Sequence, residues 1–190
     1  MKNLAIFASG NGTNAEKILE HFHNHATVRV VALFTNNQQA GVIDRVARFN
    51  TSLEVFDKAT LTRTNGLLDK LREYGVDWIA LAGFMLMVPF YLVEAFPKRI
   101  INIHPALLPA YGGKGMYGMN VHWAVVEAQE EVTGITVHYV NENYDEGAVI
   151  FQASCEIDPK DTPETVAQKV HQLEHQYYPL VLEDLMTMSD

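Results

Sequence analysis

Short apolar runs alternate with amphipathic stretches along the whole chain. Runs rich in β-branched and aromatic residues predict strands at 4–8, 28–35, 53–56, 78–82, 100–104, 134–140 and 149–153. Between them, apolar side chains recur at helical spacing and predict helices over 14–23, 41–50, 65–74, 89–96, 121–129 and 163–186. Strands that alternate with helices are typical of an α/β protein with crossover helices. The pattern therefore predicts an open, twisted and mostly parallel sheet.

The C-terminal part departs from this alternation. Only the short polar loop 141–146 separates the last two predicted strands, which leaves no room for a crossover helix. We expect these strands to form an antiparallel C-terminal hairpin. Thr162 followed by Pro163 is a typical helix start and predicts a long C-terminal helix. The 190 residues suit one core, and we expect a single domain over 1–190, since no repeat or linker divides the chain.

Composition excludes several classes of protein. With 48% hydrophobic and 19% charged residues, the chain carries enough apolar material for a sizeable core, which excludes a disordered protein. A formal net charge of −9 argues against a general nucleic-acid or membrane partner, because phosphate backbones and anionic lipids would repel it. A local site for one small anion remains open.

The chain shows no targeting signal that we recognise. The first apolar run ends at Ser9-Gly10, too short for a signal peptide, and no run approaches the ~18 apolar residues of a membrane span. Cys155 is the single cysteine, so an internal disulfide and a cysteine metal cage are excluded. We interpret Cys155 as a small strand residue and expect a cytoplasmic protein.

A glycine-rich turn joins the first predicted strand to the first helix. Backbone N–H groups in such a turn, at the positive end of a helix, can bind an anion; the residues are Gly10, Asn11, Gly12 and Thr13. The glycine spacing also matches part of the dinucleotide-binding fingerprint. However, the second strand ends in Thr35-Asn36-Asn37, without the acidic residue that binds ribose in that fingerprint. We favour the phosphate of a mononucleotide-like substrate, with a dinucleotide or a purely structural turn as alternatives.

Asn102 and His104 lie two apart at the end of a predicted central strand. Period two places both on one face, at the edge where open α/β sheets bind ligands, and Pro105 ends the strand. An amide beside an imidazole offers a hydrogen-bond donor and a group that exchanges a proton near pH 7. A carboxylate such as Asp145, in the later hairpin loop, would orient the ring if it reached His104. The alternatives are a buried polar pair and a solvated acidic loop.

Two further patterns have simple structural interpretations. His21, His23 and His25 alternate near the end of the first helix, where residues two apart do not share a face. We interpret them as helix-end and surface histidines, and predict no metal site. The apolar run Phe84–Val88 is either core or the wall of a pocket for a flat ring.

Five motifs follow one another over nearly the whole chain: ASGNGTN (8–14), LAGFM (81–85), NIHPALLP (102–109), GITVH (134–138) and DEG (145–147). Together they resemble the phosphoribosylglycinamide formyltransferases. The resemblance implies a Rossmann-like formyltransferase fold and transfer of the formyl group of 10-formyltetrahydrofolate to the amino group of glycinamide ribonucleotide, in purine biosynthesis. It implies no metal, and a monomer or homodimer that acts on small molecules.

The resemblance also assigns roles to residues. By it, Asn102 binds the oxyanion, His104 stabilises that charge and moves protons, and Asp145 holds His104, with Thr136 and His138 behind them. The resemblance also implies that the ribonucleotide phosphate binds at 10–13, within an N-terminal part of about 1–100, and that its ribose binds at Glu174. The remaining part, about 101–190, carries catalysis, and the residues expected to bind folate are Met85, Leu86, Val88, Asn102, Asn141, Tyr144 and Asp145.

The chain departs from familiar relatives in two places. Leu86 stands where many carry a basic residue near the folate, and 110–122, which contains Lys114, is several residues longer, so only His122 is matched across it. Three alternatives remain. They are a formyltetrahydrofolate deformylase, which gives the formyl group to water, a methionyl-tRNA formyltransferase, which adds an RNA-binding domain, and a non-catalytic mononucleotide-binding module.

Overall fold

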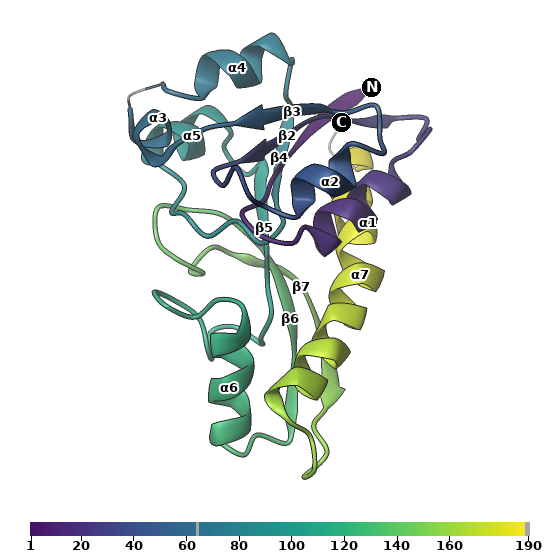
Figure 1. Ribbon diagram of the computed structural model, residues 1–190, viewed down its shortest axis with the longest axis vertical. Coiled ribbons are helices and arrows are strands. Elements are labelled where there is room, and N and C mark those ends of the chain that lie inside the picture. Colours follow the sequence, from purple (N-terminus) through teal and green to yellow (C-terminus); the bar gives the residue numbers. More distant parts are fainter. Residues whose placement is uncertain (64, 189–190) are drawn as a thin grey trace.

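One seven-stranded sheet runs through the protein in the order β3-β2-β1-β4-β5-β6-β7 (Figure 1). The computed structural model describes residues 1–63 and 65–188. Its strands are β1 (Lys2–Phe7), β2 (Val28–Thr35), β3 (Ser52–Val55), β4 (Trp78–Leu81), β5 (Ile100–His104), β6 (Val132–Tyr139) and β7 (Val149–Glu156). Its helices are α1 (Thr13–His21), α2 (Val42–Val46), α3 (Lys58–Thr62), α4 (Leu68–Glu73), α5 (Phe90–Ala95), α6 (Met119–Glu127) and α7 (Pro163–Thr187).

Strand pairing changes from parallel to antiparallel at β5. The pairs from β3 through β5 are parallel, whereas β5 pairs with β6, and β6 with β7, in antiparallel fashion. The predicted mostly parallel sheet, its antiparallel C-terminal hairpin and the long C-terminal helix are therefore confirmed. None of the helices in the described ranges combines the length and apolar character that a bilayer crossing demands.

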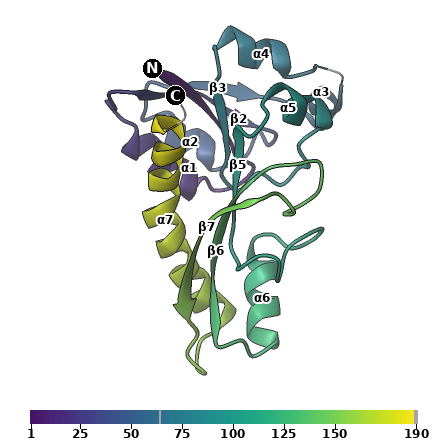
Figure 2. The same cartoon turned by 180° about the vertical axis from the view of Figure 1, so that it is seen from behind.

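Apolar side chains alternate between the two faces of the sheet. In β1, Leu4 and Ile6 join the core beneath α1, α2 and α7, while Ala5 and Phe7 join the core on the other face. Figures 1 and 2 show α7 along one face and α3, α4 and α5 on the other, while α6 packs against α7. Since both faces of the parallel strands are covered, these strands read as near-continuous apolar runs.

The same alternation sets the direction of the polar residues of β5. Ile101 and Ile103 are buried in the core on the α7 face. Asn102 and His104 therefore lie on the opposite face of the sheet. β5 ends at His104, and the chain continues from there through the 105–118 segment into α6, which packs against α7.

Helix boundaries differ from the predicted ones. The helix predicted at 41–50 spans only Val42–Val46, the one at 65–74 spans Leu68–Glu73, and α3 is not predicted at all. Asp57 begins α3 because its carboxylate accepts a hydrogen bond from the backbone N–H of Thr60 at 2.7 Å. A five-residue helix is too short to show an apolar period, which is why the hydrophobic pattern missed it.

Candidate active site

Asn102, His104 and Asp145 meet at the end of β5. The β5–β6 register places Asn102 opposite His138 and His104 opposite Thr136, and the loop after β6 brings Asp145 back over them. His104 and His138 are buried, and the side chain of Asp145 is only 12% exposed. The structure therefore brings Asp145 next to two residues that lie more than 40 positions before it in the sequence.

Asp145 has polar neighbours at both carboxylate oxygens. Its Oδ2 accepts the N–H of Gly113 at 3.0 Å and lies 3.5 Å from His104 Nδ1. Its Oδ1 lies 3.5 Å from Asn102 Nδ2 and 3.6 Å from His138 Nε2. Burial by itself raises the pKa of Asp145, but His104 and the Gly113 N–H favour the anion, and that pKa lies below its usual value. Asp145 is therefore a buried anion near neutral pH.

His104 bridges this carboxylate and a backbone carbonyl. Its Nε2 lies 2.7 Å from the oxygen of Tyr111, and because a carbonyl only accepts, Nε2 carries a proton. The opposite nitrogen, Nδ1, faces Asp145 and is the one whose proton can come and go. Burial lowers the pKa of His104, against the opposing effects of Asp145 and the Tyr111 carbonyl.

The same reasoning assigns the hydrogen-bond donors and acceptors of His138 and Asn102. His138 Nδ1 lies 2.8 Å from the oxygen of Tyr139, so it donates there, and its bare Nε2 accepts from Asn102 Nδ2 at 3.0 Å. The amide nitrogen of Asn102 therefore has one N–H engaged by His138. Its second N–H has only the long contact to Asp145 and is the donor left for a ligand.

Thr136 supports the turn that follows β5. Its hydroxyl donates to the oxygen of Ala106 at 2.7 Å and accepts from the N–H of Leu108 at 2.9 Å and from Gln152 at 2.8 Å. These bonds hold the chain just beyond His104 against β6. Thr136 and His138 thus both lie behind the residues that face the open site.

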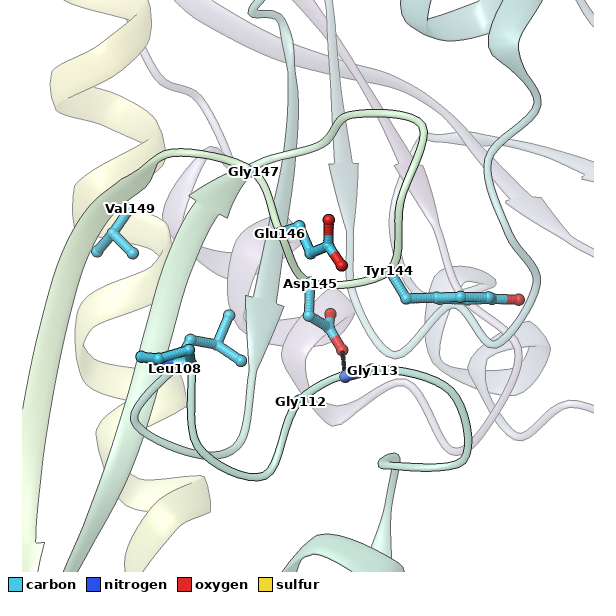
Figure 3. Close-up of a pocket in the computed structure, with 9 residues that line it drawn as sticks. Leu108, Gly112, Gly113, Tyr144, Asp145, Glu146, Gly147 and Val149 are labelled. Carbon is cyan, nitrogen blue, oxygen red and sulfur yellow. Dashed lines mark hydrogen bonds between the residues drawn. The ribbon is translucent and has the colours of Figure 1, made fainter.

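A pocket of about 420 Å³ opens beside Asp145 (Figure 3). Tyr144, Asp145 and Glu146 lie along its upper side, and the 108–113 turn lies below them. This volume falls within the range usual for small-molecule sites. The lining residues are Leu108, Pro109, Gly112, Gly113, Tyr144, Asp145, Glu146, Gly147 and Val149.

Only some of the residues expected to bind folate border this pocket. Tyr144 and Asp145 do, whereas Val88 is buried in the apolar core and Leu86 packs against that core. Met85 is 50% exposed, and its N–H donates to the hydroxyl of Ser9 at 3.0 Å, beside the glycine-rich turn. Asn141 is half-buried at the start of the β6–β7 loop, and does not line the pocket.

The glycine-rich turn has the predicted form. Gly12 precedes α1 with φ at 78°, in the left-handed region, and a Cβ there would lie 2.3 Å from Val42 Cγ2 and 2.8 Å from Val42 Cα. A side chain is therefore blocked at this position. The blocking group is α2, which packs directly on the turn.

Arg45 of α2 holds this turn in place, a contact that sequence patterns did not reveal. Its Nε donates to the oxygen of Asn11 at 2.7 Å and its Nη2 to the Asn11 side chain at 3.1 Å. Glu16 of α1 forms ion pairs with both Arg45 and Arg48. The turn therefore lies between two helices that an ion-pair network joins.

Glu174 belongs to a histidine cluster near His104. It is 4% exposed on α7, and its Oε2 lies 2.7 Å from His171 Nδ1. His122 of α6 is 2% exposed, its Nδ1 has no hydrogen-bond partner, and burial with nearby His171 lowers its pKa to about 4. His171, Glu174 and His175 recur at helical spacing, the one sequence signal that could have grouped them.

The other histidines join two helices. His21 Nε2 lies 2.7 Å from one oxygen of Glu183 on α7 and His25 Nε2 lies 3.1 Å from the other, while His23 is exposed. Across residues 1–63 and 65–188, no group of three or more His, Cys, Asp or Glu side chains is arranged to hold a metal ion. Cys155 is partly buried on β7.

Known proteins share this sequence and this fold. The family model described as formyl transferase matches residues 2–182. The phosphoribosylglycinamide formyltransferase of Bacillus subtilis is 38% identical over 100% of this chain and 97% of its own length. A chloroplastic protein of the same name from Arabidopsis thaliana is 44% identical over 93% of this chain, which spans 63% of that protein.

A solved structure agrees with these sequence matches. The crystal structure of glycinamide ribonucleotide transformylase 1 from Geobacillus kaustophilus superposes with a TM-score of 0.89 at 38% identity. The match covers 98% of this chain and 99% of that one. Sequence and fold therefore point to the same group of proteins.

Replacing Gly12 by Ala tests the packing of the turn on α2. We expect Gly12→Ala to lower the free energy of unfolding by about 1–3 kcal/mol more than Gly115→Ala does, measured by urea denaturation. Gly115 also has positive φ, at 91°, but a Cβ there meets nothing within 4 Å, so its variant carries only the conformational cost of about 1–2 kcal/mol. Equal losses in the two variants would contradict the contact with Val42.

The buried His122 predicts a pH dependence of stability. Its ring takes a proton below about 6.5 when unfolded but only near pH 4 when folded, so the unfolded state binds more protons between these values. Stability should therefore fall as the pH drops from 6.5 to 4. We expect His122→Asn to lose less stability than the wild type over this window in urea titrations, with His23→Asn, at an exposed position, as the control. Parallel pH profiles for His122→Asn and wild type would refute this.

Proposed function

The chain belongs to the formyl transferase family, and on that premise we propose that it transfers the formyl group of 10-formyltetrahydrofolate to the amino group of glycinamide ribonucleotide. The products are formylglycinamide ribonucleotide and tetrahydrofolate, as in purine biosynthesis. What supports this activity most directly is the meeting of Asn102, His104 and Asp145 beside a pocket at the end of β5.

Asn102 and His104 stabilise the charge that builds up in this reaction. The amine nitrogen attacks the formyl carbon, the carbonyl π electrons move onto oxygen, and the resulting oxyanion needs preorganised donors. One donor is the second N–H of Asn102, which otherwise makes only the long 3.5 Å contact to Asp145. Protonated His104 adds a positive charge beside it, and the anionic Asp145, 3.5 Å away, stabilises that charge.

The proton balance involves the same residues. The attacking nitrogen must lose a proton, and the folate N10 must gain one as its bond to the formyl carbon breaks. His104 can exchange a proton through Nδ1 only, because Nε2 donates to Tyr111. Burial lowers the pKa of His104, and Asp145 opposes this lowering by stabilising the imidazolium.

The ribonucleotide would lie along the N-terminal part, about 1–100, and reach α7. Backbone N–H groups of the 10–13 turn, at the start of α1, would bind its phosphate, which a net charge of −9 does not prevent, since the interaction is local. Glu174 would accept hydrogen bonds from the ribose hydroxyls. Its burial close to His104 supports this, since a carboxylate there lies near the reacting groups.

The folate would enter the pocket formed by the C-terminal part, about 101–190. Tyr144 and Leu108 offer apolar surface to a flat ring, and Asp145 offers acceptors beside it. Leu86 gives no positive charge for an acidic folate tail. We further propose a cytoplasmic enzyme with small-molecule substrates that acts as a monomer or homodimer.

An assay with and without the ribonucleotide tests the proposal. We expect rapid formation of tetrahydrofolate from 10-formyltetrahydrofolate only when glycinamide ribonucleotide is present. Asn102→Ala and His104→Ala should each lower kcat by about 100–1,000-fold, because each removes a donor to the oxyanion. The double variant should lose less than the product of the two, since the residues act as a unit.

His23→Ala, which changes an exposed histidine, is the matched control and should keep full activity. Formate release that is equally fast without the ribonucleotide would identify a hydrolase and overturn the proposed transfer. Near wild-type transfer by a folded His104→Ala variant would remove His104 from the mechanism.

Glu174→Gln tests the ribose assignment while keeping the shape of the side chain. Hydrogen bonds to a charged acceptor are the stronger kind, so we expect the KM for the ribonucleotide to rise about tenfold while that for the folate changes little. Asp184→Asn, an exposed carboxylate on the same helix, should alter neither constant. A rise confined to the KM for the folate would rule the assignment out.

A further inference from the structure

Tyr111 makes three contacts with other parts of the protein. Its backbone oxygen accepts the Nε2 proton of His104 at 2.7 Å, and its phenolic hydroxyl donates to Glu130 Oε1 at 2.7 Å. Its ring packs against the small apolar cluster of Ala106, Val121 and Val125. Tyr111 thus connects a buried active-site ring to a carboxylate on the protein surface.

The two residues after Tyr111 continue this connection to Asp145. The N–H of Gly113 donates to Asp145 Oδ2 at 3.0 Å. A Cβ on Gly112 would lie 2.5 Å from Leu108 Cδ2 and 3.4 Å from Asp145 Cβ, so a side chain there would require Leu108 to shift. The segment 111–113 therefore holds both His104 and Asp145 through backbone groups.

The backbone at Tyr111 does not favour this geometry by itself. Tyr111 has φ at 56°, a left-handed conformation that costs a non-glycine residue about 1–2 kcal/mol. The backbone on its C-terminal side continues into Gly112 and Gly113, which restrain it little. Side-chain anchors must therefore hold the Tyr111 carbonyl on His104, and the anchors present are the ring packing and the bond to Glu130.

We propose that Tyr111 and Glu130 are positioning residues of the active site, which hold the Tyr111 carbonyl on His104 Nε2 and so direct the exchangeable proton of His104 to Nδ1. Neither side chain touches a substrate in this role. Both act through the backbone of segment 111–113.

The protonated state of His104 depends on this carbonyl. The charged and titratable groups near the ring are Asp145 from the β6–β7 loop, His138 from β6, His122 from α6 and Glu174 from α7. Asp145, the Tyr111 carbonyl and Glu174 favour the imidazolium, while burial, His138 and His122 oppose it. Loss of the carbonyl contact should therefore lower the pKa of His104 further.

The inference rests on the proposed formyl transfer for its kinetic part, and the NMR titration of His104 tests it separately. Three variants remove the anchors in steps. Tyr111→Phe removes only the hydroxyl, Glu130→Ala removes only its acceptor, and Tyr111→Gly removes ring and hydroxyl while relieving the left-handed conformation. Tyr117→Phe, on the same loop, and Glu131→Ala, next to Glu130, are the matched controls; both positions are exposed.

We expect Tyr111→Phe and Glu130→Ala each to lower kcat by about two- to tenfold, the effect of one hydrogen bond, and the pair together to lower it no further than either alone. Glu130→Gln, which keeps an acceptor, should restore most of the activity. Tyr111→Gly should lower kcat by about tenfold or more, with the KM for the ribonucleotide within about twofold of wild type. The pKa of His104, followed by NMR of its labelled ring in the ligand-free protein, should fall less in Tyr111→Phe and Glu130→Ala than in Tyr111→Gly.

An unchanged His104 pKa in folded Tyr111→Gly overturns the inference, whatever happens to the activity. Additive losses in Tyr111→Phe and Glu130→Ala also overturn it, since they show that the two side chains act separately. If instead the wild type fails to transfer the formyl group but the His104 pKa falls as expected, the proposed function fails and the positioning role stands.

Discussion

The side chain of Asp145 is only 12% exposed, and a carboxylate withdrawn from water in this way is stable only where donors or cations surround it. Those partners come from β5, from β6 and from the 111–113 segment. The β5–β6 register, the return of the hairpin loop and the path of the glycine-rich segment must all be correct together for the charge to be compensated. The pKa of Asp145 stays low under this arrangement, which makes it the fixed negative charge on which His104 relies.

The proposed chemistry uses the same low-polarity surroundings. Charges interact more strongly away from water, so an imidazolium beside a buried carboxylate stabilises a nearby oxyanion better than it would at the surface. His138 contributes by accepting from Asn102 and thereby orienting its amide. The proposed phosphate site relies on backbone groups instead, and the 10–13 turn that carries them depends on α2 and on Arg45 for its shape. In this proposal, local structure lets an acidic chain bind an anion.

Much of the arrangement could be predicted from the sequence. Alternating apolar runs and helical periods place the strands, the hairpin and α7, because burial of an apolar face sets these patterns. Asn102 and His104 share a face through strand periodicity alone. A glycine such as Gly12 is required where a turn packs this closely on a helix. The short helix α3 escaped prediction because a single capping bond at Asp57, and no periodic pattern, begins it.

Contacts between distant segments were decided only in three dimensions. Sequence suggested Asp145 as a partner of His104, but the loop conformation that brings the two within 3.5 Å depends on β6 and β7 pairing in register. The carbonyl of Tyr111, the N–H of Gly113 and the grip of Arg45 on Asn11 are invisible in a pattern, since backbone groups are common to every residue. The cluster of His122 and Glu174 likewise forms only because α6 and α7 approach the same site. Periodicity determines on which face of its strand or helix a side chain lies, whereas tertiary packing alone determines which residues from other segments it contacts.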